Sequence, residues 1–233
     1  MKRIFAILSM AFFASGALAQ SATGSNAPAT DVKAAAQTMK PDELVKKVTE
    51  DVLSTVKSDK QLAAGDKEKA LKLAEEKVLP LIDFHEAARL AVGRAWAQAS
   101  KEQQEKITNE FRRMLVRTYS NAISRYEGQT MKVLPVHMKP DETDVTVRNQ
   151  YIRPGQRPVQ LDYAMHKTNE GWKIYDIVVE GVSLVLTYRS EFDQVVKQNG
   201  IDGLIKALAQ KNTPAPVGAV GGNASTGATK SAK

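Results

Sequence analysis

Apolar residues recur at helical spacing through the first half of the chain. Pro41 and the two acidic residues after it predict a helix start, because proline fits the first helical position and carboxylates favour the positive end of the helix dipole. Further helices are predicted over Asp66 to Leu79 and over Asp83 to Val92, where Gly93 provides a C-cap. This half of the chain is therefore expected to be mainly helical.

A fourth predicted helix is the longest and has an unusually wide apolar side. Ser100 and Gln103 form a capping box at its start. Its apolar positions, which run from Ile107 to Tyr126, cover roughly 180° of the circumference, against about 100° for an ordinary surface helix. We therefore expect this helix to face two different surfaces.

In the second half of the chain the apolar residues recur at every second position. This period predicts four strands, and the short polar links between them favour an antiparallel meander. The strands are expected over Met131 to Met138, Asp144 to Ile152, Pro158 to Lys167 and Trp172 to Glu180. The last one is apolar on both faces, so we expect it to be central in the sheet. The fold class is therefore α+β, with a helical part and a four-stranded antiparallel sheet.

The stretch EGVSLVLTYRSEF, residues 180–192, connects the last strand to a helix predicted over Leu184 to Gln198. Its Gly-Val-Ser start is similar to a G-x-S-x-G nucleophile elbow, but Val185 stands where the second glycine is needed for the sharp turn. Ser183 is instead expected to be the N-cap of the helix. A last helix is predicted over Asp202 to Gln210, after Gly200.

Arg189 lies inside the apolar stripe of this helix, and two interpretations are open. It could form a partly buried ion pair with Asp176 or Glu180, or it could stand at a rim near an anionic headgroup. The sequence does not choose between them.

Both ends of the chain differ in composition from its centre. Residues 1–19 have a charged start, a short apolar run and a small-residue cleavage site, which predicts a secretory signal peptide and an exported, soluble mature protein. Residues 20–39 are expected to be a flexible leader and residues 212–233 a disordered tail. One domain is expected over residues 40–211, mainly helical over 40–127 and with the sheet and the C-terminal helices over 128–211.

Charge and candidate chemistry exclude several classes of protein. The net charge is +7, or +5 once Lys2 and Arg3 are removed, and the basic residues are spread out, which disfavours nucleic-acid binding. The chain has no cysteine, and the sequence around His85 lacks the second histidine of H-E-x-x-H. His137 and His166 lie in separate predicted strands. We therefore expect no metal, no cofactor and no catalytic residues.

Three stretches carry a resemblance to a known family: WKIYDIVVEGVSLVLTYRSEF, LAVGRAW and FRRMLVRTYSNAISRYEG. They resemble the MlaC family of periplasmic phospholipid carriers, which belong to the system that maintains outer-membrane lipid asymmetry and are also called toluene-tolerance or auxiliary transport proteins. The resemblance covers about Pro41 to Asn212. It implies a helical subdomain packed on a curved antiparallel sheet of the nuclear-transport-factor-2-like (NTF2-like) type, enclosing an apolar lipid cavity.

The resemblance also implies partners and a place of action. The partners would be phospholipids, an inner-membrane ATP-driven (ABC) transporter complex with a lipid-binding MCE ring, and an outer-membrane lipoprotein held on a porin. We expect a monomeric, non-enzymatic carrier in the periplasm. Two other classes stay open: an NTF2-like enzyme that acts on a hydrophobic small molecule, and a periplasmic adaptor without a ligand.

The expected cavity lining combines the long helix, the sheet and the start of the motif helix, with Arg189 as the candidate headgroup residue. The lining candidates are apolar or aromatic positions on these elements: Leu115, Tyr119, Ile123, Val145, Val147, Tyr151, Leu161, Tyr163, Ile174, Val178, Val182, Val185 and Leu186.

Overall fold

The helices come first along the chain and the strands follow, as the hydrophobic pattern predicts. The computed structural model describes residues 29–123 and 128–213. Its first half consists of α1 (Ala29–Thr38), α2 (Pro41–Ser58), α3 (Lys60–Ala63), α4 (Lys67–Lys77), η1 (Leu79–Leu81), α5 (Phe84–Val92), η2 (Gly93–Gln98) and α6 (Lys101–Ile123). The expected signal peptide, residues 20–28 of the leader and the tail after Thr213 lie outside the described residues.

Side-chain caps fix where several of these helices begin. Asp66 and Asp83 accept hydrogen bonds from backbone amides in the first turns of α4 and α5. At the start of α6, Gln103 N donates to Ser100 Oγ at 3.2 Å and Ser100 N donates to Gln103 Oε1 at 2.9 Å. The predicted capping box is therefore confirmed.

The strands form a single antiparallel sheet. They are β1 (Thr130–Val133), β2 (Asp144–Val147), β3 (Asn149–Ile152), β4 (Val159–Thr168), β5 (Gly171–Val179) and β6 (Val182–Ser183). The order across the sheet is β1-β3-β4-β5-β6, and β2 pairs with β4 on the same side as β3. The α+β class and the antiparallel meander are confirmed.

The sheet departs from the predicted one in two details. The strand expected over Asp144 to Ile152 is interrupted at Arg148, and the two-residue β6 is added after β5, so the strand count exceeds four. The middle strand of the order is β4 rather than the last long strand; on its outer side β5 pairs with the two-residue β6 and, at Ile174, with Ile82. The face of β5 that carries Ile174 packs into the core beneath α1, whereas the other face carries Lys173 and Asp176.

The segment before Pro41 is a correction to the sequence prediction. Ala29–Thr38, expected to be part of a flexible leader, forms α1. Val32, Ala35 and Ala36 are buried in the core between this helix and the sheet. The Ala-rich composition hid a helix whose small residues allow close approach to β5.

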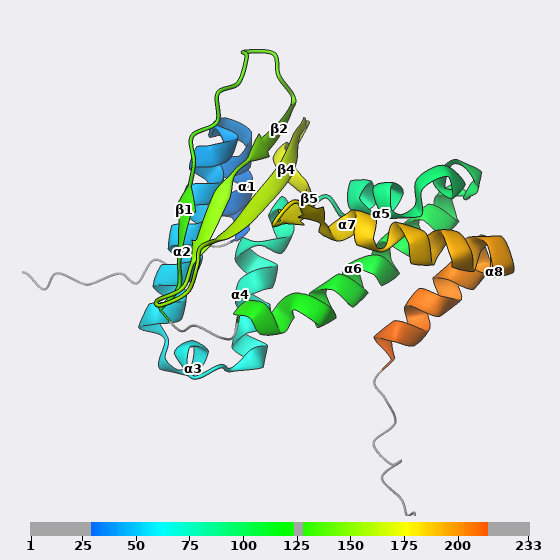
Figure 1. Ribbon diagram of the computed structural model, residues 1–233, viewed down its shortest axis with the longest axis horizontal. Coiled ribbons are helices and arrows are strands. Elements are labelled where there is room, and N and C mark those ends of the chain that lie inside the picture. Colours follow the sequence, from blue (N-terminus) through cyan, green and yellow to red (C-terminus); the bar gives the residue numbers. More distant parts are fainter. Residues whose placement is uncertain (1–28, 124–127, 214–233) are drawn as a thin grey trace, which may run out of the picture.

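A small hydrophobic cluster lies around Leu62 among α2, α3 and α4, and two large hydrophobic cores divide the rest of the described molecule. One lies between the sheet and the helices α1 and α2, and it includes Leu44, Val147 and Met165. The other lies among α5, α6, α7 (Leu184–Thr187) and α8 (Arg189–Asn212), around Phe111 and Phe192. Figure 1 shows them as a sheet-bearing lobe and a helical lobe, with α7 between them. The long helix α6 therefore contributes to the helical lobe and reaches towards the sheet.

The C-terminal helices agree with the sequence prediction at one break and differ from it at another. The predicted break at Gly200 is confirmed, because this residue has a non-helical backbone with a φ of 68° inside α8. The helix expected over Leu184 to Gln198 is, however, divided at Tyr188 into α7 and the first part of α8. Among the described residues no helix is both long and apolar enough to cross a membrane.

Candidate functional site

One face of the sheet carries most of the predicted lining residues. The antiparallel register pairs Tyr163 with Val147 and Ile177, and pairs Leu161 with Val179, so these side chains share a face. Tyr151, Val145 and Ile174 belong to the same face. Val178 pairs with Asp162 and therefore lies on the opposite face, where polar residues dominate.

Burial divides these residues into two groups. Val145, Val147, Ile174 and, in the helical lobe, Val185 are at most 8% exposed and are packed inside the two cores. A second group, formed by Tyr151, Leu161 and Tyr163, is only half-buried. The first group therefore belongs to the two large cores, whereas the second is partly accessible from the surface.

All large hydrophobic side chains that are exposed in the described part of the chain gather where the two lobes meet. They are Tyr119 (42%), Val179 (38%), Val182 (59%) and Leu186 (47%). Val179 and Val182 are paired across β5 and β6, and Leu186 follows in α7. Tyr119 is hydrogen-bonded to Tyr188 at the end of α7. We call these four residues the apolar seam.

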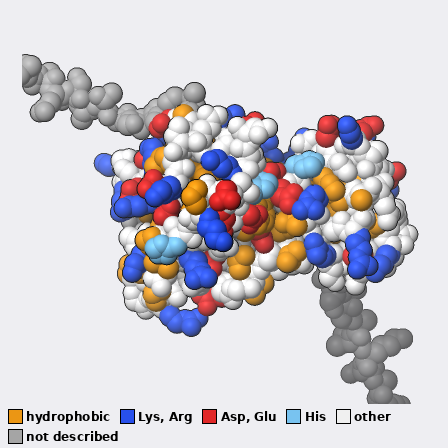
Figure 2. All heavy atoms as spheres, turned by 90° about the horizontal axis from the view of Figure 1, so that it is seen from above, with side chains coloured by type: hydrophobic (Ala, Val, Ile, Leu, Met, Phe, Trp, Pro, Cys, Tyr) orange, Lys and Arg blue, Asp and Glu red, His pale blue; other side chains and the backbone are white. Residues whose placement is uncertain are grey.

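Figure 2 shows one face of the molecule, on which basic and acidic side chains are interspersed and hydrophobic side chains lie in several small groups, some of them between the two lobes. Tyr119, Val182 and Leu186 are predicted from the sequence as lining residues, whereas Val179 is not singled out, because both faces of the last predicted strand are apolar. Val179 pairs with Val182 where β5 turns into β6, and both side chains of this pair are exposed.

The tyrosines near the seam are held in their neutral form. Burial raises the pKa of Tyr163 to about 12, and its hydroxyl donates a weak hydrogen bond to Met131 Sδ at 3.9 Å. Burial and then the hydrogen bond with Tyr119 raise the pKa of Tyr188 as well. Neutral phenols present apolar rings without charge, which suits a hydrophobic ligand better than an ionic one.

The two other predicted lining residues on α6 are Leu115 and Ile123. Leu115 is half-buried and packs against the helical core. Ile123 is the last residue of α6, and its side chain lies outside the described part of the structure.

Ser183 caps α7, as the sequence predicts. Leu186 N donates to Ser183 Oγ at 3.0 Å, and Ser183 Oγ donates to Asp176 Oδ2. Asp176 is buried in β5 and also accepts from Val185 N at 3.1 Å. The serine and the aspartate together fix the turn that joins the sheet to α7. The bond from Leu186 N to the serine oxygen is the contact of a helix N-cap.

Arg189 links two helices of the helical lobe. Its Nε and Nη2 donate to Leu90 O at 3.0 and 2.5 Å, near the end of α5. Gly93, at the C-cap of α5, leaves room for the guanidinium, because a Cβ there would lie 3.4 Å from Nε. Neither expected ion pair forms: Asp176 is bonded to Ser183, and Glu180 pairs with Arg157 at 3.3 Å.

The three histidines have different surroundings. His166 Nε2 lies 3.0 Å from Asp83 Oδ2, and His85 contacts the ring of Trp96 edge-on. His137 lies in the loop between β1 and β2. Within the described ranges no three histidine, aspartate or glutamate residues are grouped so that they could hold a metal ion.

Comparison with known proteins gives a consistent result. The family profile described as "MlaC protein" matches residues 46–210. An intermembrane phospholipid transport system binding protein MlaC from Haemophilus influenzae is 24% identical over 170 residues, which cover 72% of this chain and 79% of that protein. Toluene tolerance protein ttg2D from Pseudomonas putida is 24% identical over 176 residues, which cover 72% and 77%.

A solved structure extends the comparison to three dimensions. It is the phospholipid-binding protein from Ralstonia solanacearum in complex with a phospholipid, with a TM-score of 0.68 and 38% sequence identity. The similarity covers 75% of this chain and 97% of that one. With a profile match over most of its length and this structural likeness, the chain belongs to the MlaC family.

Proposed function

We propose that the protein is a soluble periplasmic carrier that binds a phospholipid by its acyl chains and shuttles it between the outer and the inner membrane. Membership of the MlaC family supports this proposal, as does the phospholipid bound to the similar protein from Ralstonia solanacearum. The apolar seam is the observation in this molecule that carries it. Exposed hydrophobic residues that gather in one place mark a binding site.

The energetics of transfer explain why such a carrier is needed. Shielding one methylene from water is worth roughly 0.8 kcal/mol, so two acyl chains with about 30 methylenes represent on the order of 20 kcal/mol. A phospholipid cannot cross an aqueous compartment alone against that penalty. The carrier only has to shield the acyl chains from water about as well as the bilayer does, because much tighter binding would prevent release of the lipid.

We place the acyl chains between the half-buried face of the sheet and the end of α6. Tyr151, Leu161 and Tyr163 would contact the chains from the sheet. Leu115, Tyr119 and Ile123 would do so from α6, and Val182 and Leu186 would lie at the entrance. The other predicted lining residues, Val145, Val147, Ile174, Val178 and Val185, would support these positions from behind.

Partner proteins would set the direction of lipid transport and would exchange lipid with the carrier. We propose an inner-membrane ABC transporter complex with a lipid-binding MCE ring and an outer-membrane lipoprotein–porin complex as the donor and acceptor, in either order. The family membership of the chain supports this assignment. The signal peptide of residues 1–19 would export the chain, and the carrier would need no catalytic group and no cofactor besides its lipid cargo.

Lipid loading tests this proposal. The purified protein is extracted with organic solvent and is also analysed by native mass spectrometry. We expect co-purified phospholipid, and at least about a fivefold lower load in the double variant Val182→Asp and Leu186→Asp, because charges at the entrance oppose entry of the chains. Ser190→Asp is the matched control, since it adds a charge at an exposed polar position of α8 and should leave the load unchanged. An extract without lipid, or equal loads in all variants, would contradict the proposal.

A further inference from the structure

The loop between β1 and β2 leaves one edge of the sheet open. The ladder that joins β1 to β3 ends where Leu134 N donates to Arg148 O at 2.9 Å. Beyond this bond Pro135 has no N–H to donate, and Val136 N donates to Asp42 Oδ2 of α2 at 3.1 Å. Residues 134–138 are thereby held away from β2.

The backbone of β2 therefore has free hydrogen-bonding groups. Lys167 N donates to Thr143 O at 2.8 Å, which fixes the phase of the ladder: Thr143, Val145 and Val147 turn their backbone groups towards β4. Asp144 and Thr146 consequently turn theirs to the open side. From the residues that the structure describes, no hydrogen bond reaches the backbone of either one. An unpaired strand edge is a template for a further strand.

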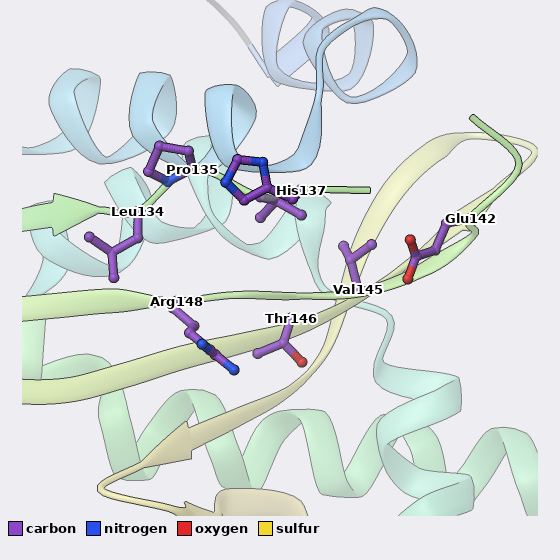
Figure 3. A pocket seen from close by; sticks show the side chains of 8 residues that line it. Leu134, Pro135, His137, Glu142, Val145, Thr146 and Arg148 are labelled. Atoms are coloured by element: carbon purple, nitrogen blue, oxygen red, sulfur yellow. The ribbon is translucent and has the colours of Figure 1, made fainter. Parts of the chain in front are cut away.

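A hollow lies between the open edge and the diverging loop. It has a volume of about 400 Å³ and lies between residues 134–137 on one side and residues 142–148 on the other (Figure 3). Val145 and Leu134 give it an apolar lining. A second hollow of about 510 Å³ shares Val136, His137 and Glu142 with the first, so the two lie next to each other along the same loop. We call the two neighbouring hollows together the edge slot.

The edge slot is rich in cations that lack acidic partners. Lys40, Lys139 and Arg148 line it, and none of the three forms an ion pair with a carboxylate of the described residues. Glu142 is the one carboxylate in its lining, and its Oε2 accepts from Lys139 N at 3.0 Å. The lining itself thus has three cations against one carboxylate, beside free backbone donors and acceptors. Two carboxylates next to it are engaged elsewhere: Asp42 accepts from Val136 N, and Asp144 accepts from the hydroxyl of Tyr175.

From these observations we propose that the edge slot is a docking site for an extended, acidic peptide segment of a partner protein. The segment adds a strand to β2 and pairs with the backbone of Asp144 and Thr146. Its apolar residues fill the lining around Val145, and its alternate acidic residues meet Arg148 and the two lysines. The tail of this chain, from residue 214, contains no acidic residue and does not fit this description.

The edge slot and the apolar seam occupy opposite edges of the sheet. The slot borders β2, and the seam includes β6 at the far end of the strand order. A peptide in the slot therefore leaves the proposed lipid entrance open. The docking proposal does not depend on lipid binding, and the two can fail separately.

A titration with model peptides tests docking. The probe is a pool of acetylated eight-residue peptides in which Val, Ile or Thr alternates with Glu or Asp, and amide resonances and hydrogen exchange are followed on the full mature chain. We expect binding with slower exchange of the Thr146 amide, and no binding of matched peptides that carry Lys in place of the acids. No response of residues 144 and 146 to the acidic pool would overturn the proposal.

Two pairs of variants separate strand addition from general attraction. Thr146→Pro removes the free N–H at an edge position where proline is tolerated, and it should weaken binding at least about tenfold, whereas Thr146→Val should not. Lys139→Glu with Arg148→Glu should also weaken binding about tenfold, whereas Lys206→Glu on α8 should not.

A second titration, with lipid vesicles, distinguishes binding of an acidic peptide from binding to an anionic membrane. Vesicles of phosphatidylglycerol and phosphatidylethanolamine replace the peptides in the same assay. Binding of the vesicles that depends on Lys139 and Arg148, together with peptide binding that Thr146→Pro does not change, would assign the cations to a membrane surface and overturn strand addition.

Discussion

Ser183 and Asp176 show how a polar pair fixes the junction between the sheet and α7. Leu186 N donates to the serine, the serine donates to the buried aspartate, and Val185 N donates to the same aspartate. The pair satisfies amides at the start of α7 that would otherwise have no partner. The serine could be identified as a cap from the sequence, but the role of Asp176 could not, because it comes from the adjacent strand.

Ser183→Ala tests the capping role. We expect it to lower the free energy of unfolding by roughly 1 kcal/mol through the lost cap, and to leave the lipid load unchanged. Chemical denaturation measures the first effect and native mass spectrometry the second. Ser54→Ala, at an exposed position of α2, should change stability little. A Ser183→Ala protein with normal stability and no lipid would contradict the capping role.

At the scale of elements, α1 lies directly against the sheet at a glycine. A Cβ at Gly171 would lie 2.2 Å from Ala36 O, and the φ of this glycine is 101°. Small residues on α1 and the missing side chain on β5 together permit this contact. The sequence did not reveal it, because alanine-rich composition also fits a flexible leader.

Gly171→Ala should separate α1 from the sheet. We expect it to destabilise the protein by several kcal/mol, since backbone atoms of α1 must move and a positive φ is strained for alanine. Gly155→Ala is the control: its φ is 71°, but a Cβ there meets nothing within 4 Å, so only about 1–2 kcal/mol of strain is expected. Chemical denaturation measures the loss of stability in each variant, and hydrogen exchange of residues 29–38 shows whether α1 separates from the sheet. Equal costs in the two variants would show that α1 does not pack firmly at this place.

At the scale of the whole molecule, two lobes meet along the apolar seam, and Arg189 stabilises the helical one. Its guanidinium donates twice to Leu90 O, so it is engaged in joining α8 to α5. Chain shielding is worth on the order of 20 kcal/mol, against ~0–1 kcal/mol for an exposed charge pair. Binding energy is therefore expected to come from the acyl chains rather than from the headgroup.

The variant Arg189→Met tests whether the binding energy comes from the acyl chains or from the headgroup. We expect a lower melting temperature, because the two hydrogen bonds to Leu90 are lost, and an unchanged ratio of phosphatidylethanolamine to phosphatidylglycerol after incubation with a mixture of both. Native mass spectrometry reads the ratio, and a water-soluble glycerophosphodiester should not compete. Loss of phosphatidylglycerol alone, without a change in stability, would assign Arg189 to the headgroup.

The sequence by itself determined the order of the elements, the caps at Ser100 and Ser183 and the antiparallel meander, because periodicity and capping depend on neighbouring residues. The tertiary structure alone decided which apolar residues are core and which form the seam. Val147 and Val182 look alike in the sequence, yet one is 0% and the other 59% exposed. Burial depends on what a distant segment covers: Val147 lies in the core beneath α2, whereas Val182 lies in the two-residue strand β6, where its side chain is left exposed.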